Sequence, residues 1–213
     1  MNERLKRIGL FGGAFDPPHN AHVALANAAC QLLELDRLYV VPTGQAWHKA
    51  RTLTAPEHRL AMTQLAFAGM PAVVVDDCEI KRAGPTFTID TLHALQAQNL
   101  GALLYLLMGA DQLAAFKQWH EWQTIVKIAT ICVAARQHIT AARGINAPEN
   151  RIDSDLDGRL VTLTMPPMAV SATQIRQLIA SGLGENLALD EWLPASVASY
   201  ISQHRLYEQP QQT

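Results

Sequence analysis

Leu10-Phe11-Gly12-Gly13-Ala14-Phe15-Asp16-Pro17-Pro18-His19-Asn20-Ala21-His22 is the stretch that decides the fold of this chain. An apolar run over residues 8–11 ends in two glycines and a turn with two prolines, and a helix-like segment begins at Val23. This order predicts a β-strand, a tight loop and a helix N-terminus. Glycines let backbone N–H groups approach a ligand, and the helix directs its unpaired N–H groups and positive dipole end at the loop. We therefore predict an anion-binding loop.

Two histidines stand at the start of the predicted helix. His19 and His22 are three residues apart, so their rings share one face of the first helical turn. The functional interpretation is that the two imidazoles face a phosphate-binding site. The alternatives are that they cap the helix or form part of a metal site. Zinc would need more ligands at recognisable spacing, and the three cysteines are scattered singly. The loop also lacks the Gly-Lys-Ser/Thr of a Walker A motif and the third glycine of the dinucleotide fingerprint.

The stretch resembles the signature of the nucleotidyltransferase superfamily that contains the adenylyltransferases of NAD and coenzyme A synthesis. The usual form is Gly-Gly-Thr/Ser-Phe-Asp-Pro followed by His/Thr-x-Gly-His. In this sequence Ala14 replaces the hydroxyl residue and Ala21 replaces the glycine of the second half. A methyl group is small, so we interpret Ala21 as tolerated. The resemblance implies that ATP lies against the loop residues Gly12, Gly13, Ala14 and Phe15.

Length and composition limit the class of protein. The 213 residues suffice for one α/β domain, or for one domain with a small appendage. A formal net charge of -2 gives no reason to expect a nucleic-acid or anionic-membrane partner. The apolar run near the N-terminus is too short for an export signal, and no later run approaches the length of a membrane span. Unclustered cysteines fit a reducing cytoplasm, so we expect a cytoplasmic globular protein whose oligomeric state stays open.

Apolar runs alternate with amphipathic segments along the chain. Strands are predicted at residues 8–11, 37–42, 72–76, 103–109, 130–134 and 160–163, with 77–82 extending an edge. Helices are predicted from 23 to about 35 and at 55–67, 88–99, 121–127, 171–181 and 194–204. This alternation predicts an α/β fold with a doubly wound parallel sheet. We expect one domain, residues 1–213, with a core of residues 1–165 and a helical C-terminal part of residues 166–213.

A second motif lies at residues 170–176. Ser171 and Gln174 form a capping-box pattern that predicts a helix start. Thr173 and Arg176 share a helix face, and an arginine matches phosphate oxygens with two parallel hydrogen bonds. A capped surface helix is the alternative, but the stretch also resembles the superfamily's Ile-Ser-Ser-Thr-x-x-Arg motif. Two signatures in the proper order, about 150 residues apart, favour function. The resemblance implies that Ser171, Thr173 and Arg176 contact ATP.

The first and fourth predicted strands both end in glycine. Ligands of open α/β sheets bind beyond the carboxyl ends of strands, where the strand order reverses. Asp111, two residues after Gly109, could then accept hydrogen bonds from the hydroxyl groups of a ribose. An ordinary helix N-cap is the alternative for Asp111, and both stay open.

Two further motifs resemble one branch of the superfamily. Residues 84–92 are similar to the Tyr-Thr-Ile-Asp-Thr-Leu signature of bacterial nicotinate-mononucleotide adenylyltransferases, with Phe87 in place of tyrosine. Asp111 followed by Trp119-x-x-Trp122 is similar too, as is the pair His48-Lys49. The resemblance covers residues 8–207 and implies a Rossmann-like fold. It also implies adenylyl transfer from ATP to nicotinate mononucleotide, giving deamido-NAD and pyrophosphate.

The same resemblance implies roles for the residues of these motifs. Trp119 would stack on the flat pyridine ring, and the helix opening at Thr88 would offer N–H donors to the ring carboxylate. Phe87 lacks the hydroxyl group of the usual tyrosine. His48 and Lys49 could reach the mononucleotide phosphate, or could be solvated cations on a loop.

Catalysis is expected from positioning and charge stabilisation by His19, His22, Thr173 and Arg176, without a protein nucleophile. Magnesium is expected on the phosphates, held mainly by ATP itself, and Asp16 could touch its water shell or only brace the loop. One alternative is an adenylyltransferase for nicotinamide mononucleotide or, less favoured, phosphopantetheine. Another is a nucleotide-binding sensor that has lost catalysis, which the alanines in the motifs suggest.

Overall fold

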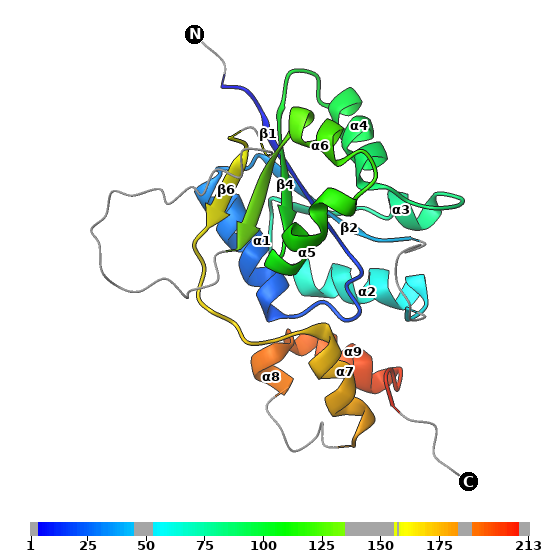
Figure 1. The fold of residues 1–213 in the computed structure, drawn as a ribbon. Helices are drawn as coiled ribbons and strands as arrows, with labels where there is room; N and C mark the ends of the chain where they lie inside the picture. The colour runs from blue at the N-terminus through cyan, green and yellow to red at the C-terminus, as the bar shows by residue number, and fades with distance from the viewer. Residues whose placement is uncertain (1–3, 45–52, 135–155, 157, 183–188, 209–213) are drawn as a thin grey trace. The chain divides into compact units, whose positions relative to one another are not determined.

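The computed structural model describes residues 4–44, 53–134, 156, 158–182 and 189–208 (Figure 1). The helices and strands in these residues follow one another in this order: β1 (Arg7–Gly13), α1 (Asn20–Leu32), β2 (Arg37–Pro42), α2 (Pro56–Phe67), β3 (Val73–Val75), α3 (Cys78–Lys81), α4 (Thr88–Gln98), β4 (Leu103–Met108), α5 (Ala110–Ala115), the 3₁₀ helix η1 (Phe116–Gln118), α6 (Trp122–Ile128), β5 (Ala129–Ala134), β6 (Leu160–Leu163), α7 (Ala172–Ala180), α8 (Leu189–Trp192) and α9 (Ala195–Gln203).

The strands form one six-stranded sheet with the order β3-β2-β1-β4-β5-β6. The pairs β1–β4, β4–β5 and β5–β6 are parallel, and the register of the first runs from Arg7 opposite Leu103 to Phe11 opposite Leu107. The strand order reverses between β1 and β4, which is where open α/β sheets bind ligands. The predicted doubly wound parallel sheet is therefore confirmed, and glycines stand at the end of β1 and directly after β4, the two strands at the reversal.

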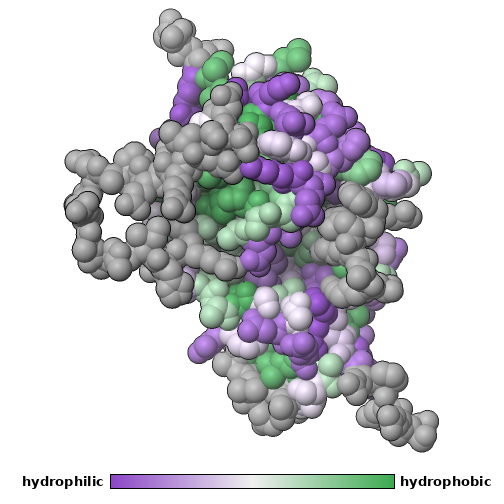
Figure 2. Space-filling model, in the orientation of Figure 1, coloured by the Kyte–Doolittle hydropathy of each residue, from purple (hydrophilic) through white to green (hydrophobic). Residues whose placement is uncertain are grey.

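The chain divides into two compact units. The first unit comprises Met1–Gly12, Leu25–Tyr39 and Phe87–Pro167, and the second comprises Gly13–Ala24, Val40–Thr86 and Met168–Thr213. In the first unit α4 packs against α6, and in the second α2 packs against α9. Figure 2 shows hydrophilic residues over α4 and α6, as expected for the solvent side of amphipathic helices. The predicted division at residue 165 stays a prediction.

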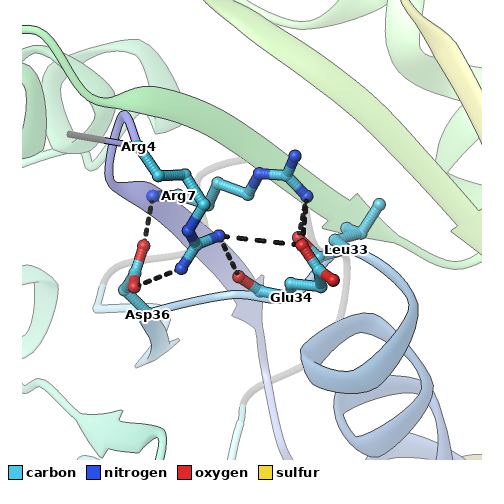
Figure 3. Close-up of polar contacts among 5 residues, drawn as sticks. All are labelled: Arg4, Arg7, Leu33, Glu34 and Asp36. Atoms are coloured by element: carbon cyan, nitrogen blue, oxygen red, sulfur yellow. Dashed lines mark hydrogen bonds and ion pairs between the residues drawn. The ribbon is translucent and has the colours of Figure 1, made fainter. Parts of the chain in front are cut away.

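Polar contacts fix the start of β1 in the first unit (Figure 3). A carboxylate oxygen of Asp36 accepts a hydrogen bond from the Arg7 backbone N–H at 2.7 Å, and the other accepts one from Arg4 Nη2 at 2.6 Å. Arg7 Nη1 donates to the carbonyl of Leu33 at 2.9 Å and pairs with Glu34 at 3.3 Å. Exposed ion pairs contribute little to stability, so the main effect of these contacts is to position the start of β1. These contacts set where β1 begins relative to the turn between α1 and β2.

Two predicted elements are corrected by the structure. Within residues 77–82, expected to extend a strand edge, Cys78–Lys81 form the short helix α3 instead. Asp76 Oδ1 accepts a hydrogen bond from the Cys78 N–H at 2.8 Å, which turns the chain, and Lys81 pairs with Asp77 across one helical turn at 2.9 Å. The first helix ends at Leu32, before the predicted end near residue 35. The chain leaves it through a residue in the left-handed region, a common helix termination.

Buried apolar residues from neighbouring strands form the centre of the first unit. Ile8 and Leu10 of β1, Leu106 of β4 and Ile131 of β5 are all at most 3% exposed. Strands buried on both faces are typical of parallel sheets, which explains their continuous apolar sequences. None of the described helices combines the length and the apolar character that crossing a membrane requires.

Candidate active site

The glycine loop, residues 12–16 at the end of β1, contains a buried aromatic ring. Phe15 is 2% exposed and has a positive φ of 46°. Its ring packs edge-on against His22 and Phe67, with centroid distances of 5.2 and 6.2 Å. A Cβ added to Gly13 would lie 3.1 to 3.3 Å from the same ring, so glycine fits best there. The Phe15 side chain thus supports the loop, and its predicted contact with ATP stays a prediction.

His19 and His22 are brought together at the start of α1. Their rings stack with a centroid distance of 3.7 Å and an interplanar angle of 23°. The His19 carbonyl accepts hydrogen bonds from the N–H groups of His22 and Val23, and the His19 N–H donates to His22 Nδ1 at 3.1 Å. Because Nδ1 accepts this bond, a neutral His22 carries its proton on Nε2. His22 is therefore prepared to donate a hydrogen bond from Nε2.

His19 is neutral at pH 7. Its side chain is only 7% exposed, and burial lowers its pKa from 6.5 to about 4. Its Nδ1 atom is buried without a hydrogen-bond partner among the described residues. A neutral His19 means that the stacked pair does not hold two positive charges at 3.7 Å. The pair can donate hydrogen bonds to an anion without mutual repulsion.

This burial makes the free energy of unfolding depend on pH. The unfolded chain binds a proton at His19 below a pKa of 6.5, whereas the folded chain binds it only near pH 4. As pH falls from 6.5 towards 4, His19 should therefore remove about 1.4 kcal/mol of stability per pH unit. Above pH 6.5 its contribution is constant. Urea unfolding of the wild type and of His19→Gln at pH 5 to 7 measures the difference. Identical slopes of stability against pH would contradict the assignment.

The second motif forms the N-terminus of α7, as its capping pattern predicts. Ser171 Oγ accepts a hydrogen bond from the Gln174 N–H at 3.3 Å and contacts Gln174 Oε1 at 2.9 Å. One turn on, Arg176 Nη2 donates to Thr173 Oγ1 at 3.1 Å. Arg176 Nη1 donates to the backbone carbonyl of Asp16 at 2.6 Å. This last bond, within the second unit, brings together two motifs that lie 160 residues apart in sequence.

Asp16 has a buried carboxylate, 1% exposed, at the centre of the loop. One oxygen accepts a hydrogen bond from the Tyr207 hydroxyl at 2.8 Å, and the other accepts one from the Thr54 N–H at 3.3 Å. Since both oxygens are engaged by protein donors, the geometry favours the bracing role of Asp16 over contact with a magnesium water shell.

Residues 57–60 are also similar to the family, but sequence reasoning assigned no role to Arg59, which holds the loop as well. It is 2% exposed, and its Nε and Nη1 atoms donate to the carbonyls of Thr54 and Ala14 at 2.9 and 3.0 Å. Arg59 shares the buried face of α2 with Met62 and Ala66. A charged residue on the apolar face of a predicted helix is a sequence signal that could have indicated a buried, hydrogen-bonded arginine here.

The two motifs predicted to bind the mononucleotide meet in the first unit. Thr88 opens α4 with Phe87 at its N-cap, and the Phe87 ring lies 4.4 Å from the ring of His120. Trp119, the preceding residue, is the C-cap of η1 and contacts Phe116 edge-on with a centroid distance of 5.5 Å. His120 is a second residue that sequence reasoning missed. The aromatic contact joins the N-terminus of α4 to the tryptophan turn.

Asp111 lies in the first turn of α5, whose N-cap is Gly109. The N-cap alternative for Asp111 is therefore wrong, because the capping position belongs to the glycine two residues earlier. A Cβ added to Gly12, at the end of neighbouring β1, would meet no described atom within 4 Å. Backbone at the end of β1 is thus open to close approach, and the ribose contact of Asp111 stays a prediction.

The remaining predictions concern phosphate and metal contacts. His48 and Lys49 lie outside the described residues. Within the described part of the chain, no group of three or more His, Cys, Asp or Glu side chains is arranged to hold a metal ion. The donors that the loop and α7 do offer are imidazole, hydroxyl and guanidinium groups, which suit an anion.

Comparisons with known proteins place this geometry in context. Residues 10–178 match the model of a family described as cytidylyltransferase-like. The chain is 48% identical over 204 residues to an Albidiferax ferrireducens protein named "Probable nicotinate-nucleotide adenylyltransferase", with 96% of this chain and 99% of that protein covered. A Bordetella petrii protein of the same name is 43% identical, with 95% and 100% covered.

The fold is similar to that of a solved structure of Plasmodium falciparum nicotinic acid mononucleotide adenylyltransferase complexed with NaAD. The TM-score is 0.75, and the match covers 95% of this chain and 97% of the other. The sequence identity is 20%, so this likeness supports the fold. The predicted Rossmann-like architecture is confirmed.

Proposed function

This chain belongs to the cytidylyltransferase-like family and, within it, to the nicotinate-nucleotide adenylyltransferases, and from that premise we propose that it transfers the adenylyl group of ATP to nicotinate mononucleotide. The products are deamido-NAD and pyrophosphate. The observation that carries the proposal is the bond from Arg176 to the Asp16 carbonyl, because it unites the glycine loop and α7 in one anion-binding arrangement. Small-molecule substrates and a cytoplasmic location belong to the same proposal.

The reaction is a direct displacement at phosphorus. An oxygen of the mononucleotide phosphate attacks the α-phosphorus of ATP, and the bond from that phosphorus to the oxygen bridging to the β-phosphate breaks. Pyrophosphate leaves with the electron pair. The attacking oxygen is already anionic, so neither a protein nucleophile nor a covalent intermediate is needed. Catalysis then depends on orientation and on stabilising charge as it moves to the leaving group.

The proposed donors to the phosphates come from two helix N-termini of the second unit. His22 would donate from Nε2, the tautomer that its bond with the His19 N–H selects. Arg176 and Thr173, joined by a hydrogen bond of 3.1 Å, would supply charge and a hydroxyl group. Neutral His19 adds no charge, and Ser171 caps the helix that carries the other two. Helix N-termini favour anions, so backbone N–H groups support the same ligand.

Magnesium is proposed to arrive with ATP. When bound to the phosphates it neutralises negative charge, and it prefers phosphate oxygens and water as ligands. The donors present fit this arrangement, because the carboxylate of the loop itself, Asp16, is buried and accepts hydrogen bonds on both oxygens. The protein would then bind the phosphates through N–H and guanidinium groups.

Trp119→Ala tests the acceptor half of the proposal. Stacking of the indole on the pyridine ring stabilises the bound mononucleotide, so the KM for nicotinate mononucleotide should rise by about tenfold. The KM for ATP should change much less. Steady-state kinetics with each substrate varied in turn provides the measurement. Equal effects on both substrates would count against stacking.

One assay tests the proposed function as a whole. Pyrophosphate release is measured with ATP and magnesium and with nicotinate mononucleotide, nicotinamide mononucleotide or phosphopantetheine as acceptor. The highest kcat/KM is expected with nicotinate mononucleotide. A higher value with either other acceptor would replace the proposed substrate, and no release with any would favour a nucleotide-binding sensor.

A further inference from the structure

The glycine loop is tied to a residue near the end of the described chain. The Tyr207 hydroxyl donates a hydrogen bond of 2.8 Å to Asp16 Oδ1 across 191 residues of sequence. Asp16 in turn presents its backbone carbonyl to Arg176 Nη1 at 2.6 Å. A single loop residue therefore connects the phenol of Tyr207 with the guanidinium of Arg176, and all three belong to the second unit.

The orientation of Arg176 depends on this connection. Its two Nη atoms donate to Asp16 O and to Thr173 Oγ1, so the plane of the guanidinium is fixed by two acceptors on different segments. Thr173 belongs to the same helix turn and moves with Arg176. The Asp16 carbonyl is thus the acceptor that locates the guanidinium relative to the loop. Moving Asp16 would tilt the group that meets the phosphates.

The Tyr207 hydroxyl stays protonated and can therefore always donate its hydrogen bond to Asp16. Burial, and then the negative charge of Asp16, raise its pKa far above the usual value, so the hydroxyl keeps its proton at any working pH. The chain reaches this position through two residues with positive φ, Arg205 at 50° and Tyr207 at 68°. Such backbone conformations are unfavourable for residues other than glycine and persist where surrounding contacts determine them.

We propose that Tyr207 is a positioning residue for adenylyl transfer, which acts through Asp16 to hold Arg176 in the orientation that the transition state requires. The inference rests on the proposed function. It assigns Tyr207 no contact with substrate. Its effect should fall on kcat, because a loosely held guanidinium can still bind ATP but stabilises the moving charge less well.

Tyr207→Phe removes only the hydroxyl group, and Tyr200→Phe is the matched control. Tyr200, on α9 of the same unit, makes its own hydrogen bond, with Nδ1 of His58 on α2 at 3.0 Å. Tyr207→Phe should lower kcat about tenfold or more while the KM for ATP changes less than about threefold. Tyr200→Phe should leave both unchanged. An equal loss of kcat in the two variants would overturn the proposal.

A double variant separates positioning from general destabilisation. If Tyr207 acts through Arg176, adding Tyr207→Phe to Arg176→Ala should lower kcat no further than Arg176→Ala alone. Losses that multiply would show that the hydroxyl acts independently of Arg176 and would overturn the proposal. Pyrophosphate release from radiolabelled ATP is sensitive enough for the slow variants.

Hydrogen exchange decides the inference even where the proposed function fails. Absence of pyrophosphate release from the wild type would refute the function but not the positioning of the loop. In the free protein, Tyr207→Phe should speed amide exchange over residues 12–16 by about fivefold or more, and Tyr200→Phe should not. Unchanged exchange in Tyr207→Phe would refute the positioning itself.

Discussion

Replacing His22 by alanine should lower kcat for adenylyl transfer by about a hundredfold or more, with little change in the KM for either substrate. A preorganised donor to developing charge contributes on this scale, and its loss appears in the chemical step. The structure prepares that donor, because the His19 N–H occupies His22 Nδ1 at 3.1 Å and leaves the proton on Nε2. The Phe15 ring also packs edge-on against the imidazole, with a centroid distance of 5.2 Å.

Two amide variants of His22 distinguish the loss of the Nε2 hydrogen-bond donor from the loss of the imidazole ring. The side-chain nitrogen of His22→Gln can take the place of Nε2, so this variant should recover part of the lost activity. The shorter side chain of His22→Asn can replace only Nδ1, so its kcat should stay near that of the alanine variant. Pyrophosphate release at saturating substrates measures all three. Wild-type turnover in His22→Ala, or equal activity of the two amides, would remove His22 from the proposed mechanism.

The fold follows from the sequence because its signals are local and strong. Continuous apolar runs predict the six strands, and β2 begins and ends at Arg37 and Pro42 as predicted. The errors lie where a side chain redirects a few residues. Asp76 starts α3 by accepting the Cys78 N–H, where a strand edge was expected. Periodicity over a long window does not reveal such a short-range contact.

For the candidate site, too, the sequence predicts local features and not contacts between distant segments. The spacing of His19 and His22, and of Thr173 and Arg176, predicts which side chains share a helix face, and both pairs are in contact. What sequence could not predict is how the loop is held, because those bonds join distant segments. Tyr207 carries no local pattern that relates it to Asp16, 191 residues away.

The proposed mononucleotide site shows the same limit of prediction from sequence. The resemblance to known motifs points to Phe87 and Trp119 separately. The contact between the Phe87 and His120 rings, which joins those motifs at 4.4 Å, needs the tertiary structure of the first unit. Sequence motifs therefore identify the chemical groups of the site, and the tertiary contacts supply their mutual orientation.

Arg59→Met should destabilise the protein by on the order of 3 kcal/mol. Replacing a buried charge by an apolar side chain can be neutral when every partner is replaced with it. Here the partners include the backbone carbonyls of Thr54 and Ala14, two half-buried residues, which would lose donors at 2.9 and 3.0 Å. The cost of two unsatisfied carbonyls outweighs the gain from removing the charge of a side chain that is 2% exposed. Urea unfolding measures the difference.

Arg37→Met is the matched control, since Arg37 is exposed on β2, and its free energy of unfolding should change by less than about 0.5 kcal/mol. Arg59→Lys should recover little stability, because one ammonium group cannot reproduce the fixed fork that reaches both carbonyls. An unfolding midpoint of Arg59→Met equal to that of the wild type would mean that the loop does not depend on this arginine. A lysine variant as stable as the wild type would mean that charge, rather than the fork of donors, is what the site requires.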